Sequence, residues 1–182
     1  MPVRRTFWGV FILSLSLLLY ELTLIRVYSA TLFYHFAFMA ISVAMLGIAG
    51  AGLTVHLTPQ RFSRENIGNW TVKWSIAFGI TLPIVFWIVF RIPVNAYLPP
   101  NQIAGKLTLI YILSAIPFYC AGIVFSGLFS AIPEKIGKLY SWDLVGAGVG
   151  SLAMLPLMNI VGGETAGLVI SIMAFASALC LV

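Results

Sequence analysis

Six long apolar runs follow one another along the chain, and this repetition limits the folds open to it. A helix that crosses the roughly 30 Å hydrocarbon core of a bilayer needs about 20 mostly apolar residues. Residues with turn or helix-breaking chemistry separate the runs. The runs cover residues 7–28, 32–57, 71–92, 106–132, 140–159 and 164–182. The pattern predicts an all-α fold, a polytopic membrane helix bundle of six transmembrane helices that forms a single domain over residues 1–182.

The small number of polar residues indicates that lipid, rather than water, surrounds this bundle. Only 8% of the residues are charged and 61% are hydrophobic, whereas ordinary soluble domains carry about 25% charged residues. Such a chain cannot cover a water-facing surface, so the lipid bilayer is its expected partner. The net charge of +5 does not indicate a nucleic-acid partner, because the basic residues stand singly or in pairs at the ends of apolar runs.

The basic residues predict how the bundle is oriented. With a cytoplasmic N-terminus, seven fall on the inner side and three, namely Arg26, Arg91 and Lys106, on the outer side. This imbalance follows the positive-inside rule, and it places both termini in the cytoplasm and the chain in the cell (inner) membrane. The seven inner residues are Arg4, Arg5, Arg61, Arg64, Lys73, Lys135 and Lys138.

The two ends of the chain allow other interpretations. Arg4-Arg5 before an apolar run is loosely like a twin-arginine or secretory signal. The run continues to Tyr28 and a second run follows at once, so the first helix of a hairpin is the favoured interpretation. The last run reaches Val182 without a polar or aromatic stop, which suggests a piece of a longer protein.

Four titratable residues within the apolar runs matter most, namely Glu21, Arg26, His35 and Asp143. A charge inside a span costs about 2.5–3.5 kcal/mol on insertion scales. Glu21 and Arg26 are five residues apart, which separates them by about 140° around the helix and makes them poor partners. Arg26 and His35 lie at similar depth near the outer interface, where Arg26 can snorkel to headgroups. His35 can be a satisfied interfacial histidine, and Asp143 a cap or a functional group. Glu21 lies about 7 Å deeper than Arg26, which favours a functional or bundle-specifying role.

Small residues predict where helices pack closely. In the second run, Ala37, Ala40, Ala44, Gly47, Ala51 and Thr54 recur every three or four residues and share one face. In the fifth run, Gly146 and Gly150 form a GxxxG pair on the same face as Asp143. A nucleotide-binding loop is excluded there, because no strand precedes the glycines and they lie inside an apolar run.

No pattern typical of catalysis is present. The sequence has no HExxH, GxSxG or P-loop motif, and Cys120 and Cys180 stand alone in apolar runs. We therefore expect no metal and no cofactor.

Two segments resemble a known family. The stretch LLLYELTLIRVYS (17–29), followed by FYHFAFMAISVAMLGIAGAGL (33–53), resembles the first hairpin of bacterial membrane-embedded spermidine synthase-like proteins. The later YSWDLVGAGVG (140–150) is similar to that family's Y-x-x-D-L-x-G-A segment. The resemblance implies a multi-helix membrane region like half of a major-facilitator transporter, joined to a soluble aminopropyltransferase-like domain. By the same resemblance, Glu21, Arg26, His35 and Asp143 are the matching polar positions.

Two functions follow as expectations. The soluble catalytic domain of that family is missing from these 182 residues, so we expect no spermidine synthesis by this chain alone. The first hypothesis is a membrane domain that acts as an anchor and as a conduit for a small, polyamine-like cation, with Glu21 and Asp143 supplying negative charge. The alternative is a non-catalytic structural subunit of a larger membrane complex. Apart from the lipid bilayer, the expected partners of the chain are other membrane subunits or a second copy of itself.

Overall fold

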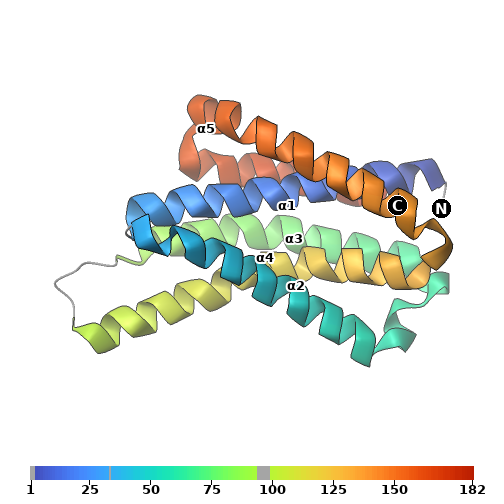
Figure 1. Ribbon diagram of the computed structural model, residues 1–182, viewed down its shortest axis with the longest axis horizontal. Helices are drawn as coiled ribbons and strands as arrows, with labels where there is room; N and C mark the ends of the chain where they lie inside the picture. Colours follow the sequence, from blue (N-terminus) through green and yellow to red (C-terminus); the bar gives the residue numbers. More distant parts are fainter. Residues whose placement is uncertain (1–2, 33, 94–98) are drawn as a thin grey trace.

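The computed structural model describes residues 3–32, 34–93 and 99–182, and within these ranges it is helical and contains no strand. The all-α prediction is therefore confirmed for the described residues. Short 3-10 helices connect the longer elements (Figure 1). In chain order the elements are α1 (Val3–Thr31), η1 (Tyr34–Phe38), α2 (Met39–Leu57), η2 (Pro59–Phe62), η3 (Arg64–Asn66), α3 (Ile67–Arg91), α4 (Pro100–Ala131), η4 (Pro133–Lys135) and α5 (Ile136–Cys180).

The last element reverses its direction at Gly162. The backbone of this residue has φ 73° and ψ 171°, a conformation that glycine adopts readily because it has no Cβ. It divides α5 into a first arm, residues 136–161, and a second arm, residues 163–180. The second arm folds back along the bundle, so the N- and C-termini lie at the same end (Figure 1).

The helices begin and end at places that hydropathy alone does not mark. The fourth apolar run begins at residue 106, but α4 begins at Pro100. Proline at this position lacks only an N–H that the first turn of a helix leaves unpaired. The Gln102 N–H is bonded to the Pro99 carbonyl and the Asn101 side chain, so polar residues extend the helix beyond the apolar run.

The helices form two connected groups. α1 packs mainly against the two arms of α5, and α2 packs mainly against α4. α3 lies against both α4 and α5 and joins the groups. This arrangement leaves α2 and the first arm of α5 at the periphery of the bundle (Figure 1).

Glycines on facing helices bring α2 and α4 into backbone contact. A Cβ placed on Gly47 would lie 2.6 Å from the Ala115 carbonyl oxygen, and one on Gly122 would lie 3.2 Å from the Ile48 Cα. The small residues of α2 lie on this buried side of the helix, namely Ala40, Ala44, Gly47 and Ala51. A larger residue at Gly47 or Gly122 would have to push the two helices apart.

The GxxxG pair of α5 lies against α1. A Cβ on Gly146 would clash with the Phe11 carbonyl oxygen, and one on Gly150 would lie 2.9 Å from the Leu15 carbonyl oxygen. Both glycines are buried. The first arm of α5 therefore approaches the backbone of α1 over at least one full turn.

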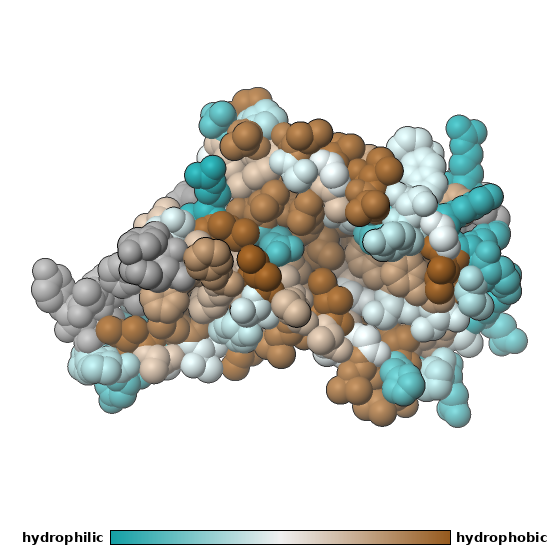
Figure 2. All heavy atoms as spheres, in the orientation of Figure 1, coloured by the Kyte–Doolittle hydropathy of each residue, from teal (hydrophilic) through white to brown (hydrophobic). Residues whose placement is uncertain are grey.

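The end that holds both termini is also the more basic end of the bundle. The turns that follow α2 and α4 meet there, since Arg64 Nη1 lies 3.1 Å from Glu134 Oε1. Ser177 Oγ of the second α5 arm donates a hydrogen bond to the Gly9 carbonyl of α1. Figure 2 shows hydrophilic residues concentrated towards this end, with apolar residues over the middle of the visible face. We call it the basic end.

Candidate functional site

Two adjacent residues in the middle of α1 lie in opposite environments. The Tyr20 side chain is fully buried among aromatic rings, with the Phe118 ring centroid 4.7 Å and the Phe86 centroid 5.5 Å away. Glu21, the next residue, is half-buried. The helical turn of about 100° per residue produces this contrast.

Tyrosine hydroxyls tie α1 to α4 in the interior. Tyr20 Oη donates to the Ser114 carbonyl oxygen at 3.0 Å, and Tyr28 Oη donates to Ser114 Oγ at 2.6 Å. All three side chains are 0% exposed, so a missing partner would be costly in hydrocarbon. Pro117, one turn further along α4, has no N–H and weakens the helical hydrogen bonding around Ser114. We define Tyr20, Tyr28 and Ser114 as the tyrosine lock.

Sequence reasoning did not identify the tyrosine lock. Its members are separated by 86 and 94 residues, so no local pattern connects them. A local signal nearby is Pro117, but it removes the helical hydrogen bond to the carbonyl of Leu113, the residue before Ser114, and so does not specify the lock.

Glu21 makes no hydrogen bond or ion pair with any residue that the structure describes. Arg26, on the same helix, is exposed and is likewise not paired with it. The side chain of His35 lies outside the described part of the structure. A half-buried carboxyl group without a protein partner, near the middle of an apolar helix, is the least satisfied polar feature among the predicted site residues.

Asp143 lies one and a half to two turns from the start of α5, near the basic end. Its backbone carbonyl accepts a hydrogen bond of 2.7 Å from Ser14 Oγ of α1. The neighbouring Trp142 ring packs among Phe7, Trp8 and Phe11, with the Trp8 centroid 5.0 Å away. This aromatic cluster fixes the first arm of α5 against the start of α1.

The structure does not bring Glu21 and Asp143 together into one site. Ser14, which contacts Asp143, lies seven residues before Glu21, a distance of about 10 Å along α1. The two carboxyl groups therefore lie at different depths in the bundle.

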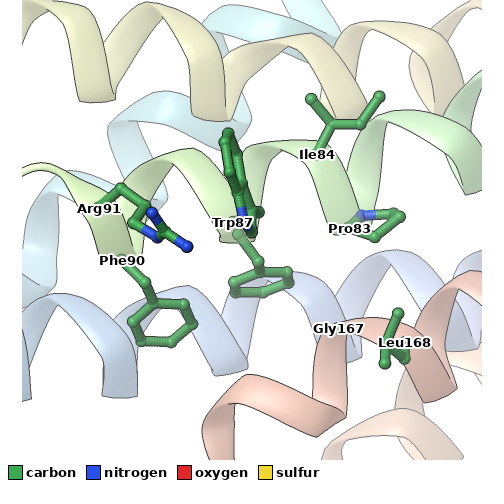
Figure 3. Close-up of a pocket in the computed structure, with 8 residues that line it drawn as sticks. Pro83, Ile84, Trp87, Phe90, Arg91, Gly167 and Leu168 are labelled. Carbon is green, nitrogen blue, oxygen red and sulfur yellow. The ribbon is translucent and has the colours of Figure 1, made fainter.

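A groove of about 850 Å³ lies between α3 and the second arm of α5. Its walls are mostly apolar and one cation, Arg91, stands at its end (Figure 3). Neither Glu21 nor Asp143 lines it. A smaller cavity of about 290 Å³ at the basic end is lined by residues that include Thr6, Arg64, Glu65 and Lys135.

Among the described residues, no group of three or more His, Cys, Asp or Glu side chains is arranged to hold a metal ion. Comparisons of the chain with protein-family models, with curated proteins and with solved structures found no match. Function must therefore be argued from the residues and their geometry.

Proposed function

We propose that this chain is an integral membrane domain whose main role is to anchor a protein in the bilayer. Among the residues that the structure describes, five helices are long and apolar enough to cross a membrane by length and composition. The proposal rests on the surface of the bundle, which is apolar where that of a water-soluble protein would be polar. Large apolar side chains point outwards, such as Leu152 at 78% and Ile160 at 81% exposed, while the tyrosine lock is sealed inside.

A sixth crossing would be made by the second arm of α5. The first arm has 26 residues and the second has 18, which correspond to lengths of about 39 Å and 27 Å. The second length is close to the roughly 30 Å of hydrocarbon that must be crossed. Six crossings would return the chain to the side on which it started, in keeping with the shared end of the two termini.

The basic end is proposed to face the cytoplasm, with the chain in the cell (inner) membrane. Seven of the ten Lys and Arg residues belong to this end by chain order, and three belong to the other. Positive charge close to the ends of spans is retained on the cytoplasmic side.

The anchor role can be tested with a soluble reporter fused after Val182. The reporter should stay in the membrane fraction through an alkaline carbonate wash and should be released by detergent. The unfused reporter, made at the same level, is the control and should remain soluble. Release of the fused reporter by carbonate alone would contradict the proposal.

The resemblance to spermidine synthase-like proteins suggests what this domain would anchor. A soluble aminopropyltransferase-like domain following a cytoplasmic C-terminus would lie where polyamine metabolism can supply it. The purified chain alone is expected to transfer no aminopropyl group from decarboxylated S-adenosylmethionine to putrescine. Transfer above the level of a protein-free blank would contradict this part of the proposal.

A second candidate function, a conduit for a polyamine-like cation, is favoured by one observation. Glu21 is the half-buried carboxyl group without a partner among the described residues, and a fixed negative charge would attract a cationic solute. Vesicles that contain the protein should then take up labelled spermidine, and Glu21→Gln should abolish the uptake. Glu65→Gln is the matched control, since Glu65 is exposed in η3. Uptake that Glu21→Gln leaves unchanged removes Glu21 from the mechanism.

The peripheral position of α2 and the first α5 arm favours the alternative of a structural subunit. Their outward faces carry exposed apolar residues that include Met45, Leu53, Leu144 and Leu152. Purification in a mild detergent distinguishes a structural subunit from a domain that acts without other subunits. A partner that co-migrates in fixed stoichiometry supports the subunit, and a monodisperse lone chain or homodimer argues against it.

A further inference from the structure

The groove between α3 and the second arm of α5 follows from the way these two helices cross. They are in contact at Gly79, whose carbonyl accepts a 2.6 Å hydrogen bond from Ser171 Oγ. At Gly167 the second arm makes room for the Phe86 ring, since a Cβ there would lie 2.5 Å from that ring. Between this contact and the end of α3, the groove opens to the outside of the bundle.

The length of the groove corresponds to one leaflet of a bilayer. Along α3 its lining runs from Pro83 to Arg91, eight residues or about 12 Å. Half of the hydrocarbon core is about 15 Å thick. Since Arg91 is the last residue of α3, it lies at headgroup depth when Pro83 lies near the midplane of the bilayer.

The chemistry of the groove changes along this length. Ile84 and Leu168, about half exposed, form apolar walls, and Trp87 lies between them and the cation. The Arg91 guanidinium carbon lies 5.0 Å from the centre of the Trp87 ring, which limits its freedom (Figure 3). Arg91 makes no ion pair with any described residue, so no described carboxylate competes with an anionic ligand for its charge.

We propose that this groove binds one anionic phospholipid, with an acyl chain along the apolar walls and the phosphate group at Arg91. A guanidinium group matches phosphate oxygens with two parallel hydrogen bonds. A free phosphate ion would leave the apolar length of the groove uncovered, so the occupant is a lipid. The site is separate from Glu21 and Asp143, and it does not depend on the anchor or conduit function beyond residence in a membrane.

The test is native mass spectrometry of the whole chain in detergent, with phosphatidylglycerol and phosphatidylcholine of identical acyl chains added in equal amounts. The wild-type chain should retain one phosphatidylglycerol in preference to phosphatidylcholine. Arg91→Gln should reduce that preference about fivefold, the ratio that corresponds to the roughly 1 kcal/mol contributed by one basic residue near an anionic surface. Arg26→Gln is the matched control, because Arg26 is an exposed arginine of the same end that does not line the groove.

A second variant tests the groove without touching the charge. Leu168→Trp should fill it and reduce retention of both lipids, while Leu152→Trp, on the outer face of the first α5 arm, should not. The proposal is overturned if both lipids are retained equally by the wild type. It is also overturned if Arg26→Gln matches Arg91→Gln, or if Leu168→Trp has no effect. Dimers that exclude lipid from the groove would show that a second copy covers it instead.

Discussion

Two of the glycine-mediated crossings in this bundle use the same residue type for different purposes. At the α2–α4 crossing, Gly47 and Gly122 let backbone meet backbone. At the crossing of α3 with the second α5 arm, Gly79 and Gly167 each receive an aromatic ring, from Phe175 and Phe86 respectively. The first arrangement brings two backbones into contact, while the second admits aromatic rings and leaves a groove beyond them. A small residue in a helix therefore predicts a close contact with a neighbouring helix, but not whether a backbone or a side chain makes that contact.

The largest expected effect comes from placing a large side chain where the backbones of α2 and α4 are in contact. Gly47→Leu should lower the free energy of unfolding by about 3 kcal/mol, because the Ala115 and Tyr119 backbone cannot move aside without separating the helices. The free energy of unfolding is measured by dissolving the folded protein in a mild detergent and titrating it with a denaturing detergent. Gly148→Leu is the matched control, since a Cβ there meets nothing within 4 Å. Equal destabilisation by the two changes would show that the α2–α4 contact is not tight.

A smaller effect is expected where a ring occupies the space. Gly167→Ala should lower the free energy of unfolding by about 1 kcal/mol, since the Phe86 side chain can turn more easily than a backbone can shift. Gly47→Ala, measured in the same way, should cost more than Gly167→Ala. A larger loss of stability for Gly167→Ala than for Gly47→Ala would contradict the distinction between the two crossings.

The smallest effect concerns the hydrogen bond that supports the ring-filled crossing. Ser171→Ala removes the donor to the Gly79 carbonyl, and hydrogen bonds between helices in membranes contribute about 0.6 kcal/mol on average. Ser151→Ala is the control, because Ser151 is exposed and bonds within its own helix. A loss well above 1.7 kcal/mol for Ser171→Ala would mean that this bond, rather than ring packing, holds α3 to α5.

The all-helical fold could be predicted from the sequence because apolar runs of about 20 residues are typical of helices long enough to cross a bilayer. Helical periodicity also placed Ala40, Ala44, Gly47 and Ala51 on one face, and this face is the buried one in the structure. The ends of the helices were harder to predict. Polar residues such as Asn101 and Gln102 continue a helix into the interface, where hydropathy gives no signal.

The candidate site was less accessible to sequence reasoning. Glu21 and Asp143 were recognisable because charges are rare in apolar runs, but their separation depends on how α5 lies against α1. The tyrosine lock joins residues that are far apart in the chain. The groove at Arg91 arises from a crossing between the third helix and the last, and helix pairing of this kind has no signature in a single sequence.

The most direct test of the central claim, a bundle that crosses the membrane with its basic end in the cytoplasm, is the accessibility of single cysteines. Gln60 lies in η2 at the basic end and Gln102 at the start of α4, and both are exposed. In a background with Cys120→Ala and Cys180→Ala, each is changed to cysteine and treated with a membrane-impermeant maleimide. We predict that Gln102→Cys is labelled in intact cells and Gln60→Cys only after the cells are opened. Labelling of both in intact cells, or the opposite pattern, would contradict the claim.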